Sequence, residues 1–315
     1  MKRNYQWRLF RIRKVDITLH ISLLFLLFIV YLGSSTQFHE VVKFSGIDPN
    51  KITGSPSLWG FFFTLSLVTS IFVHELSHVI VAQKNGGKVR QINLMMLGGV
   101  SEIEFLPQTP SIEIKVSIIG PLVSIAIGTV LYQLHHFIGG ENLAFYGFWV
   151  GQLNIGLGIF NLIPAFPTDG GRILRAFLVS RQGPIKGTQN AVKVSNLFSI
   201  LFVTVGVLTS NLILVLIAFF IYAASKSELF TMVAKKALEG LTVRDLVSSV
   251  PKILIPQKTS SPTIDIDEPL EKALKLGVSS GVSSIPVLDH DEMIGLIRIS
   301  DLIETIQNKQ ITDNG

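Results

Sequence analysis

The chain contains no cysteine among its 315 residues. This absence excludes a disulfide framework, and it removes the thiolate ligands on which many structural zinc sites depend. Any transition-metal site must therefore be built from histidine and carboxylate side chains. The chain has 7 histidines, so the candidates for such a site are few.

Charged residues are also scarce, at 16% of the chain, where a soluble domain has about 25%. Apolar residues make up 48%, and the mean hydropathy is +0.50. A net charge of +5 would suit nucleic acid, but the basic residues cluster beside apolar segments and form no separate stripe. These values predict a polytopic α-helical membrane protein that does not bind nucleic acid.

Six apolar segments approach the roughly 20 residues that a helix needs to span a bilayer. The basic start of the first segment and the small residues after it resemble a signal peptide, but no Ala-x-Ala site follows. We therefore expect an uncleaved anchor and about six transmembrane helices. The predicted spans are residues 15–33, 57–83, 112–137, 143–164, 191–209 and 211–231.

The basic residues predict the orientation of the spans. Residues 1–14 carry six of them and no acid, and the positive-inside rule places this end in the cytoplasm. Six crossings return the chain to the cytoplasm. Of the lysines and arginines that flank the spans, only Lys43 and Lys51 then lie on the predicted outer side of the membrane. We predict a multi-pass protein of the cell membrane with both termini in the cytoplasm.

The composition changes after the last span. Residues 1–235 form the predicted membrane domain, and residues 241–306 alternate short strand and helix patterns typical of a small soluble α/β module. Strands are expected over 263–266, 284–288 and 293–297. Residues 307–315 are a polar tail that we expect to be frayed.

Residues 74–78 read His-Glu-Leu-Ser-His within the second span. On a helix this spacing puts two imidazoles on one face, as a pair of zinc ligands with Glu75 beside them as a candidate general base. The alternative is a helix with a buried histidine pair. That alternative weakens in a membrane, where unpaired ionisable groups are costly.

Two histidines leave a catalytic zinc site one protein ligand short. Residues 161–172, at the end of the fourth span, read Asn-Leu-Ile-Pro-Ala-Phe-Pro-Thr-Asp-Gly-Gly-Arg. The prolines end the helix, and the glycines are expected to allow a tight turn that displays Asp169. Topology places Asp169 on the cytoplasmic side together with His74 and His78, so we expect the three to meet at one ion.

The pentapeptide at 74–78 and the motif at 161–170 together resemble the site-2 protease family of intramembrane zinc metalloproteases. Residues 19–22, 97–100 and 120–124 resemble the same family. The resemblance extends over about residues 1–230. The appended module resembles the CBS domain of an archaeal and bacterial branch.

This resemblance implies one Zn²⁺ per chain, bound by His74, His78 and Asp169, with Glu75 as the catalytic base. The implied substrate is a transmembrane segment of another protein in the bilayer, cleaved for regulated intramembrane proteolysis or for removal of signal-peptide remnants. Asn161 is a further catalytic candidate, because its amide would reach the substrate backbone. Its alternative role is a hydrogen bond that holds the end of the fourth span.

Residues 88–105 contain two β-like runs around Gly98-Gly99. They predict a small membrane-associated β hairpin whose edge pairs with an extended substrate strand. An ordinary loop is the alternative. His20 is expected near the cytoplasmic end of the first span, as an interfacial or packing residue.

The module contains a single CBS-like repeat, and such repeats work in pairs, so we expect a homodimer through it. The resemblance also admits an adenine nucleotide at Asp301. Arg298 stands where a nucleotide-binding repeat usually has Thr or Ser, and this speaks for a structural role of Asp301 at a helix start instead.

Two functions from other classes compete with proteolysis. One is a transporter or channel gated by the module, but the spans show no inverted repeat and no acidic relay at midplane. The other is a silent binder of membrane helices, which the intact Glu75 disfavours.

Overall fold

The computed structural model describes residues 6–95, 98–107, 109–134, 137, 139–247, 262–290 and 292–313. The chain is mostly helical and divides into two compact units, residues 1–225 and 226–315. The division falls inside α8 (Leu212–Leu238), so this long helix contributes to both units. It lies N-terminal to residue 235, where we expected the membrane domain to end.

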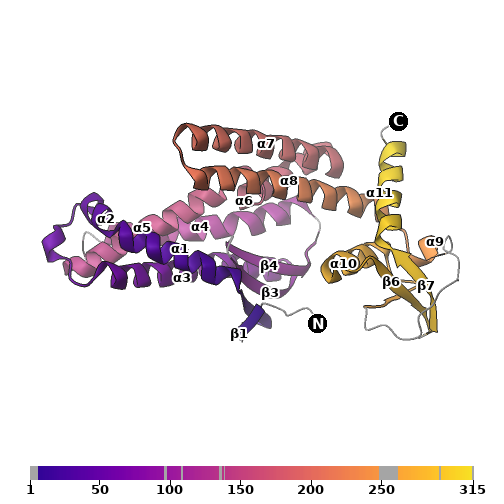
Figure 1. Cartoon of the computed structure of the whole chain (residues 1–315), viewed down its shortest axis with the longest axis horizontal. Helices are drawn as coiled ribbons and strands as arrows, with labels where there is room; N and C mark the ends of the chain where they lie inside the picture. Colours follow the sequence, from indigo (N-terminus) through magenta and orange to yellow (C-terminus); the bar gives the residue numbers. More distant parts are fainter. Residues whose placement is uncertain are drawn as a thin grey trace. The chain divides into compact units, whose positions relative to one another are not determined.

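Five helices of the described residues are long and apolar enough to cross a membrane (Figure 1). Each overlaps one of the predicted spans from the second to the sixth. They are α3 (Pro56–Lys84), α4 (Pro110–Leu134), α5 (Glu141–Asn161), α7 (Pro184–Leu208) and α8. A further pair of helices, α1 (Ser22–Thr36) and α2 (Phe38–Ser45), is bent by 62°. If this pair counts as one span, the total among the described residues rises to six.

The first predicted span was wrong at its start. Residues Val15–His20 form strand β2, and α1 begins at Ser22. Hydropathy cannot separate a buried strand from a buried helix. The strand forms because β2 pairs with β3 (Lys88–Met95), a segment distant in sequence. His20 is therefore the last residue of a strand, and its Nδ1 accepts a hydrogen bond from the backbone N–H of Ser22 at 3.2 Å.

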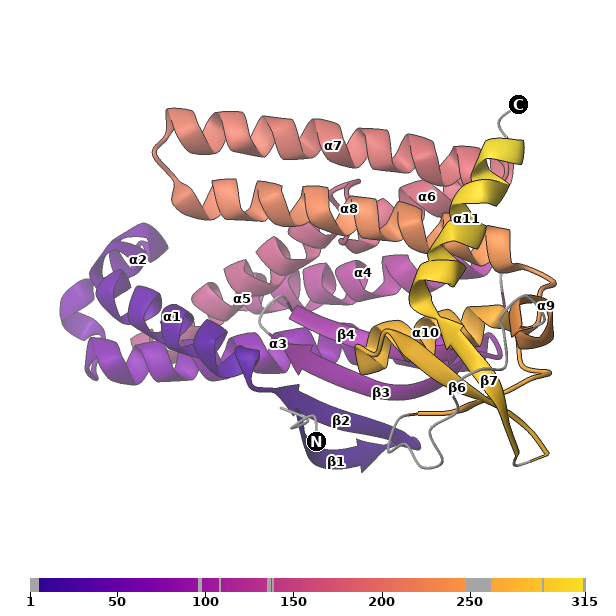
Figure 2. The same ribbon diagram turned by 45° about the vertical axis from the view of Figure 1, so that its right-hand side comes forward.

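Four strands form one sheet beside the helices, in the order β1-β2-β3-β4 (Figure 2). β1 (Gln6–Ile12) is antiparallel to β2, β2 is parallel to β3, and β3 is antiparallel to β4 (Gly98–Phe105). The predicted hairpin at 88–105 is confirmed, but the glycine pair lies within its second strand. Met95 pairs with Gly98 and Leu94 with Gly99, so both glycines belong to β4. β4 ends the sheet, and its outer edge has no strand partner among the described residues.

α4 and α5 approach each other closely through glycine. A Cβ atom at Gly128 would lie 2.7 Å from the carbonyl oxygen of Gly151, which leaves no room for a side chain. Small residues allow such contacts between helices in a bilayer, where packing drives association. Asn154 of α5 donates a hydrogen bond to Ser70 Oγ of α3 at 2.9 Å and ties a third span to the pair.

The opposite end of the spans from the β sheet is closed by aromatic side chains. Phe38 of α2 packs on Trp59 of α3 and on Phe145 of α5, with ring centroids 6.3 and 5.7 Å apart. The short 3-10 helix η1 (Pro49–Lys51) leads from α2 to α3, and Lys51 pairs with Glu141 at 3.1 Å. These contacts hold the bent pair against the other spans.

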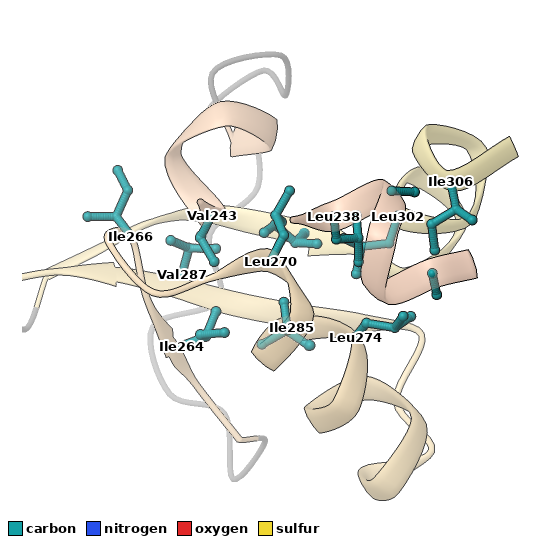
Figure 3. Close-up of a cluster of buried hydrophobic side chains, with 14 of the residues drawn as sticks. Leu238, Val243, Ile264, Ile266, Leu270, Leu274, Ile285, Val287, Leu302 and Ile306 are labelled. Carbon is teal, nitrogen blue, oxygen red and sulfur yellow. The ribbon is translucent and has the colours of Figure 1, made fainter. Parts of the chain in front are cut away.

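The second unit is a small α/β module with a three-stranded sheet in the order β5-β6-β7. Its elements are α9 (Val243–Val247), β5 (Ile264–Asp265), α10 (Leu270–Ser280), β6 (Ser284–Asp289), β7 (Glu292–Arg298) and α11 (Ile299–Asp313). Figure 3 shows the core, a cluster that includes Ile285 and Val287 of β6, Leu302 of α11 and Leu238 of α8. α11 continues to Asp313, so most of the residues expected as a polar tail belong to this helix.

Candidate active site

The two histidines of the pentapeptide lie on one buried face of α3. His74 is 3% exposed and His78 7%, and their ring centroids are 4.8 Å apart. The helix spacing of four residues brings the rings together, as the sequence predicts.

The loop between α5 and α6 (Asp169–Gln182) presents Asp169 to these rings. Thr168 precedes α6 and caps it, since its Oγ1 accepts from the Gly171 N–H at 3.4 Å. The loop is also held by α7, because the Phe166 N–H donates to the buried Ser195 Oγ at 3.0 Å. Asp169 thus occupies a rigid position at the start of a helix.

The two glycines after Asp169 do not form the tight turn that we expected. Both lie in the first turn of α6. A Cβ at Gly170 would lie 2.3 Å from the carbonyl oxygen of Leu162, and one at Gly171 would lie 2.6 Å from the carbonyl carbon of Ala165. Glycine is required here because the helix start packs directly against the preceding loop.

The structure brings Asp169 together with both histidines. Asp169 Oδ2 lies 3.1 Å from His74 Nε2 and 3.2 Å from His78 Nε2, and the three ligand atoms lie within 4.8 Å of one another. Zinc with bonds of about 2.0–2.2 Å places tetrahedral ligands roughly 3.3 Å apart. The donor set and its spacing therefore fit one zinc ion with a coordination position left for water or substrate.

The far ring nitrogens of both histidines are held by α4. His74 Nδ1 lies 3.0 Å from Ser124 Oγ, and His78 Nδ1 lies 2.6 Å from the carbonyl oxygen of Val116. Between these contacts lies Gly120, where an added Cβ would be 2.3 Å from His78 Nε2 and 2.8 Å from His74 Nε2. Sequence reasoning missed this role of α4. The available signal was the spacing of four residues between Gly120 and Ser124 inside a span.

Glu75 follows His74 in α3 and is 9% exposed. The backbone of β4 lies against it: an added Cβ at Gly99 would be 2.2 Å from Glu75 Cγ and 2.9 Å from its Oε1. The edge strand of the sheet therefore runs beside the carboxylate next to the metal-ligand group.

Asn154 and Asn161 of α5 hold helices in this structure. Asn154 joins α5 to α3 through Ser70. Asn161 donates from its Nδ2 to the Leu157 carbonyl, one turn earlier, at 2.9 Å. This contact is the one expected from the alternative role of Asn161, and a contact with substrate stays a prediction.

A His-His-Asp group and an adjacent glutamate, with both histidines and the glutamate on a membrane-spanning helix, define a metallohydrolase of the membrane. The family model for Peptidase family M50 matches residues 62–144 and 140–205, and the CBS domain model matches residues 241–308. The chain belongs to Peptidase family M50, the site-2 protease family.

Two relatives and one solved structure support this membership. A zinc metalloprotease of Methanocaldococcus jannaschii is 31% identical over 303 residues, which cover 95% of this chain and 80% of that protein. Rip3 of Mycobacterium tuberculosis is 25% identical over 281 residues, covering 84% of this chain and 69% of that protein. The structure of the site-2 protease from Methanocaldococcus jannaschii covers 71% of this chain and 95% of that chain, with 35% identity and a TM-score of 0.53. The chain is thus an integral membrane zinc metalloprotease with a CBS domain.

Proposed function

We propose that the chain hydrolyses peptide bonds in or near transmembrane segments of other membrane proteins, with His74, His78 and Asp169 as zinc ligands and Glu75 as the general base. The observation that carries this proposal is the meeting of the three ligand atoms, two of which belong to the membrane-spanning helix that also carries Glu75. The biological outcome would be regulated intramembrane proteolysis or removal of signal-peptide remnants.

The chemistry follows from the arrangement of these groups. Zinc at this site would lower the pKa of a water molecule toward about 7 and polarise the scissile carbonyl. Glu75 accepts the proton of the attacking water and returns it to the departing amine. Because Glu75 is buried beside β4, its carboxylate would lie close to a substrate whose extended backbone pairs with this strand.

Glu75→Gln tests the assignment. Purified wild type and variant are compared on a model single-span substrate, with zinc counted in both, and Glu40→Gln on the exposed face of α2 serves as the matched control. We expect Glu75→Gln to retain zinc and lose cleavage, by a factor of at least about 10². Equal cleavage by wild type and Glu75→Gln would overturn the assignment. Zinc binding without cleavage in all three proteins would favour the silent helix binder.

The outer edge of β4 is the proposed docking site for the substrate backbone. A transmembrane helix hides its carbonyls in internal hydrogen bonds, so a cleavable segment must first become extended. An unpartnered strand edge offers such a segment new hydrogen bonds, and Gly99 places this edge beside Glu75. Gly99→Val is a poor test, because the new side chain would collide with Glu75 whether or not the edge binds substrate.

Cysteine cross-linking tests the edge directly, since the chain has no cysteine of its own. Ser101→Cys is combined with Glu75→Gln, which keeps the substrate uncut, and single cysteines are moved along the substrate. Strand pairing predicts disulfide formation at alternate substrate positions. A helical periodicity of three to four positions, or no cross-links, would contradict the proposal.

Both termini are proposed to lie in the cytoplasm. The basic residues before the first span support this orientation, as does an even number of crossings when α1 and α2 count as one span. Lys51→Cys and Lys275→Cys are exposed positions for labelling with a membrane-impermeant maleimide in intact cells. Labelling of position 51 alone supports the orientation, and labelling of position 275 alone reverses it.

The CBS domain is proposed to pair with that of a second chain, because a single repeat is present in residues 241–308. Light scattering of the intact protein in detergent tests this, and a strict monomer would contradict it. A structural role is proposed for Asp301, whose carboxylate lies 3.6 Å from Arg298 Nε and accepts from Ser300 Oγ at 3.1 Å. Calorimetry with ATP tests this second proposal, which saturable binding lost in Asp301→Ala would overturn.

A further inference from the structure

Ser124 is a buried serine on α4 whose hydroxyl faces a metal-ligand histidine. It is 1% exposed, and its Oγ lies 3.0 Å from His74 Nδ1, although 50 residues separate the two in sequence. We propose that Ser124 is a positioning residue that sets the tautomer and ring orientation of His74. This inference rests on the proposed metal site.

The proposed metal site implies one tautomer of His74. His74 Nε2 lies 3.1 Å from Asp169 Oδ2 within the proposed ligand group, and a nitrogen that binds a metal ion does so through its lone pair. The ring proton then resides on Nδ1, where Ser124 Oγ accepts it. A histidine ligand held in this way binds metal more tightly, because neither the tautomer nor the ring angle has to be selected during binding.

The second histidine has an equivalent support of a different kind. His78 Nδ1 donates to the Val116 carbonyl, two helical turns before Ser124 on the same helix. The two supports lie on one face of α4, with Gly120 between them, so this face of α4 contacts both histidine rings. The Val116 acceptor is backbone and survives mutation, whereas the Ser124 acceptor is a side chain and can be removed.

The test compares zinc affinity in the intact, detergent-solubilised protein by competition with a chelator. Ser124→Ala removes the acceptor, Ser124→Thr retains a hydroxyl, and Ser70→Ala is the matched control. Ser70 is another buried serine, and its hydroxyl joins two spans by accepting a hydrogen bond from Asn154. We expect Ser124→Ala to weaken zinc binding by about 10- to 100-fold. Ser124→Thr should recover most of this loss, and Ser70→Ala should bind zinc as wild type does.

Nitrogen NMR of histidine-labelled wild type provides a readout that does not depend on the folding of any variant. A proton on Nδ1 of His74 in the zinc-free protein supports the inference, and a neutral ring with its proton on Nε2 overturns it. Zinc affinity unchanged in Ser124→Ala also overturns it, as does an equal loss in Ser70→Ala. If wild type itself bound no zinc at His74, the proposed function would fail first, so the two failures are distinguishable.

Discussion

Gly120 is the position where the smallest change should have the largest effect on the metal site. Alanine at this position adds a single methyl group to α4. That Cβ would lie 2.3 Å from His78 Nε2, 2.5 Å from His78 Cε1 and 2.8 Å from His74 Nε2. Ordinary contacts of a Cβ begin at 3.4 Å, so the His78 ring would have to retreat by about 1 Å. Metal sites tolerate errors of only about 0.2 Å in ligand distance.

We therefore expect Gly120→Ala to lose zinc, with an apparent affinity at least about 10²-fold weaker than that of wild type. The cost to the zinc-free fold is smaller. Overpacking costs about 1–3 kcal/mol, and the better helix propensity of alanine offsets roughly 1 kcal/mol of this. The assay is zinc content per chain, together with thermal unfolding in the presence and absence of zinc.

Two other glycines provide matched controls for Gly120→Ala. A Cβ added at Gly156 of α5 would meet nothing within 4 Å among the described residues, so Gly156→Ala should keep both stability and zinc. Gly128, two turns further along α4, would clash with Ile155 of α5, and Gly128→Ala should lose stability while keeping its zinc affinity. Full zinc occupancy in Gly120→Ala would refute the reasoning, and so would equal zinc loss in Gly128→Ala.

Three further predictions concern the loop, the metal and the module. Ser195→Ala leaves the buried Phe166 N–H without its acceptor, which should cost about 1–3 kcal/mol of stability and weaken zinc binding. The control Ser199→Ala removes a hydrogen bond to the Ala218 carbonyl and should leave zinc binding unchanged. Equal zinc affinities in the two variants would contradict this prediction. Chelation should abolish cleavage, and added zinc should restore it; cleavage that persists in zinc-free protein would exclude metal catalysis. Ile285→Ala, at a fully buried position, should destabilise the CBS domain by about 2–5 kcal/mol, measured by limited proteolysis, and unchanged protection would contradict the place of this side chain in the core.

Local patterns in the sequence were sufficient for the spans and for the histidine pair. Hydropathy over about 20 residues reports burial in lipid directly, and five of the predicted spans match helices. The placement of His74 and His78 on one face depends only on the helical repeat. Asp169 was a sound candidate because proline and glycine around it end a helix, but no local pattern measures its distance to α3.

Contacts between distant segments lay beyond such patterns. Residues 15–20 are apolar enough for a helix, and only pairing with β3 makes them a strand. The glycines after Asp169 suggested a turn, whereas their function is contact with the preceding loop. Asn161 had a catalytic and a structural alternative; its amide donates to the Leu157 carbonyl within α5, and a contact with substrate stays a prediction.

The sequence by itself determined a polytopic membrane protein with two histidines on one helix face, because hydropathy and helical periodicity act within one helix. The metalloprotease class, the catalytic base and the CBS domain were expectations from the resemblance of its motifs to a known family. The tertiary structure alone decided how α4 supports both rings through Ser124 and Val116, why Gly120 has no side chain, and which strand lies beside Glu75. Such contacts join segments up to 50 residues apart, and their distances depend on how whole helices and strands pack.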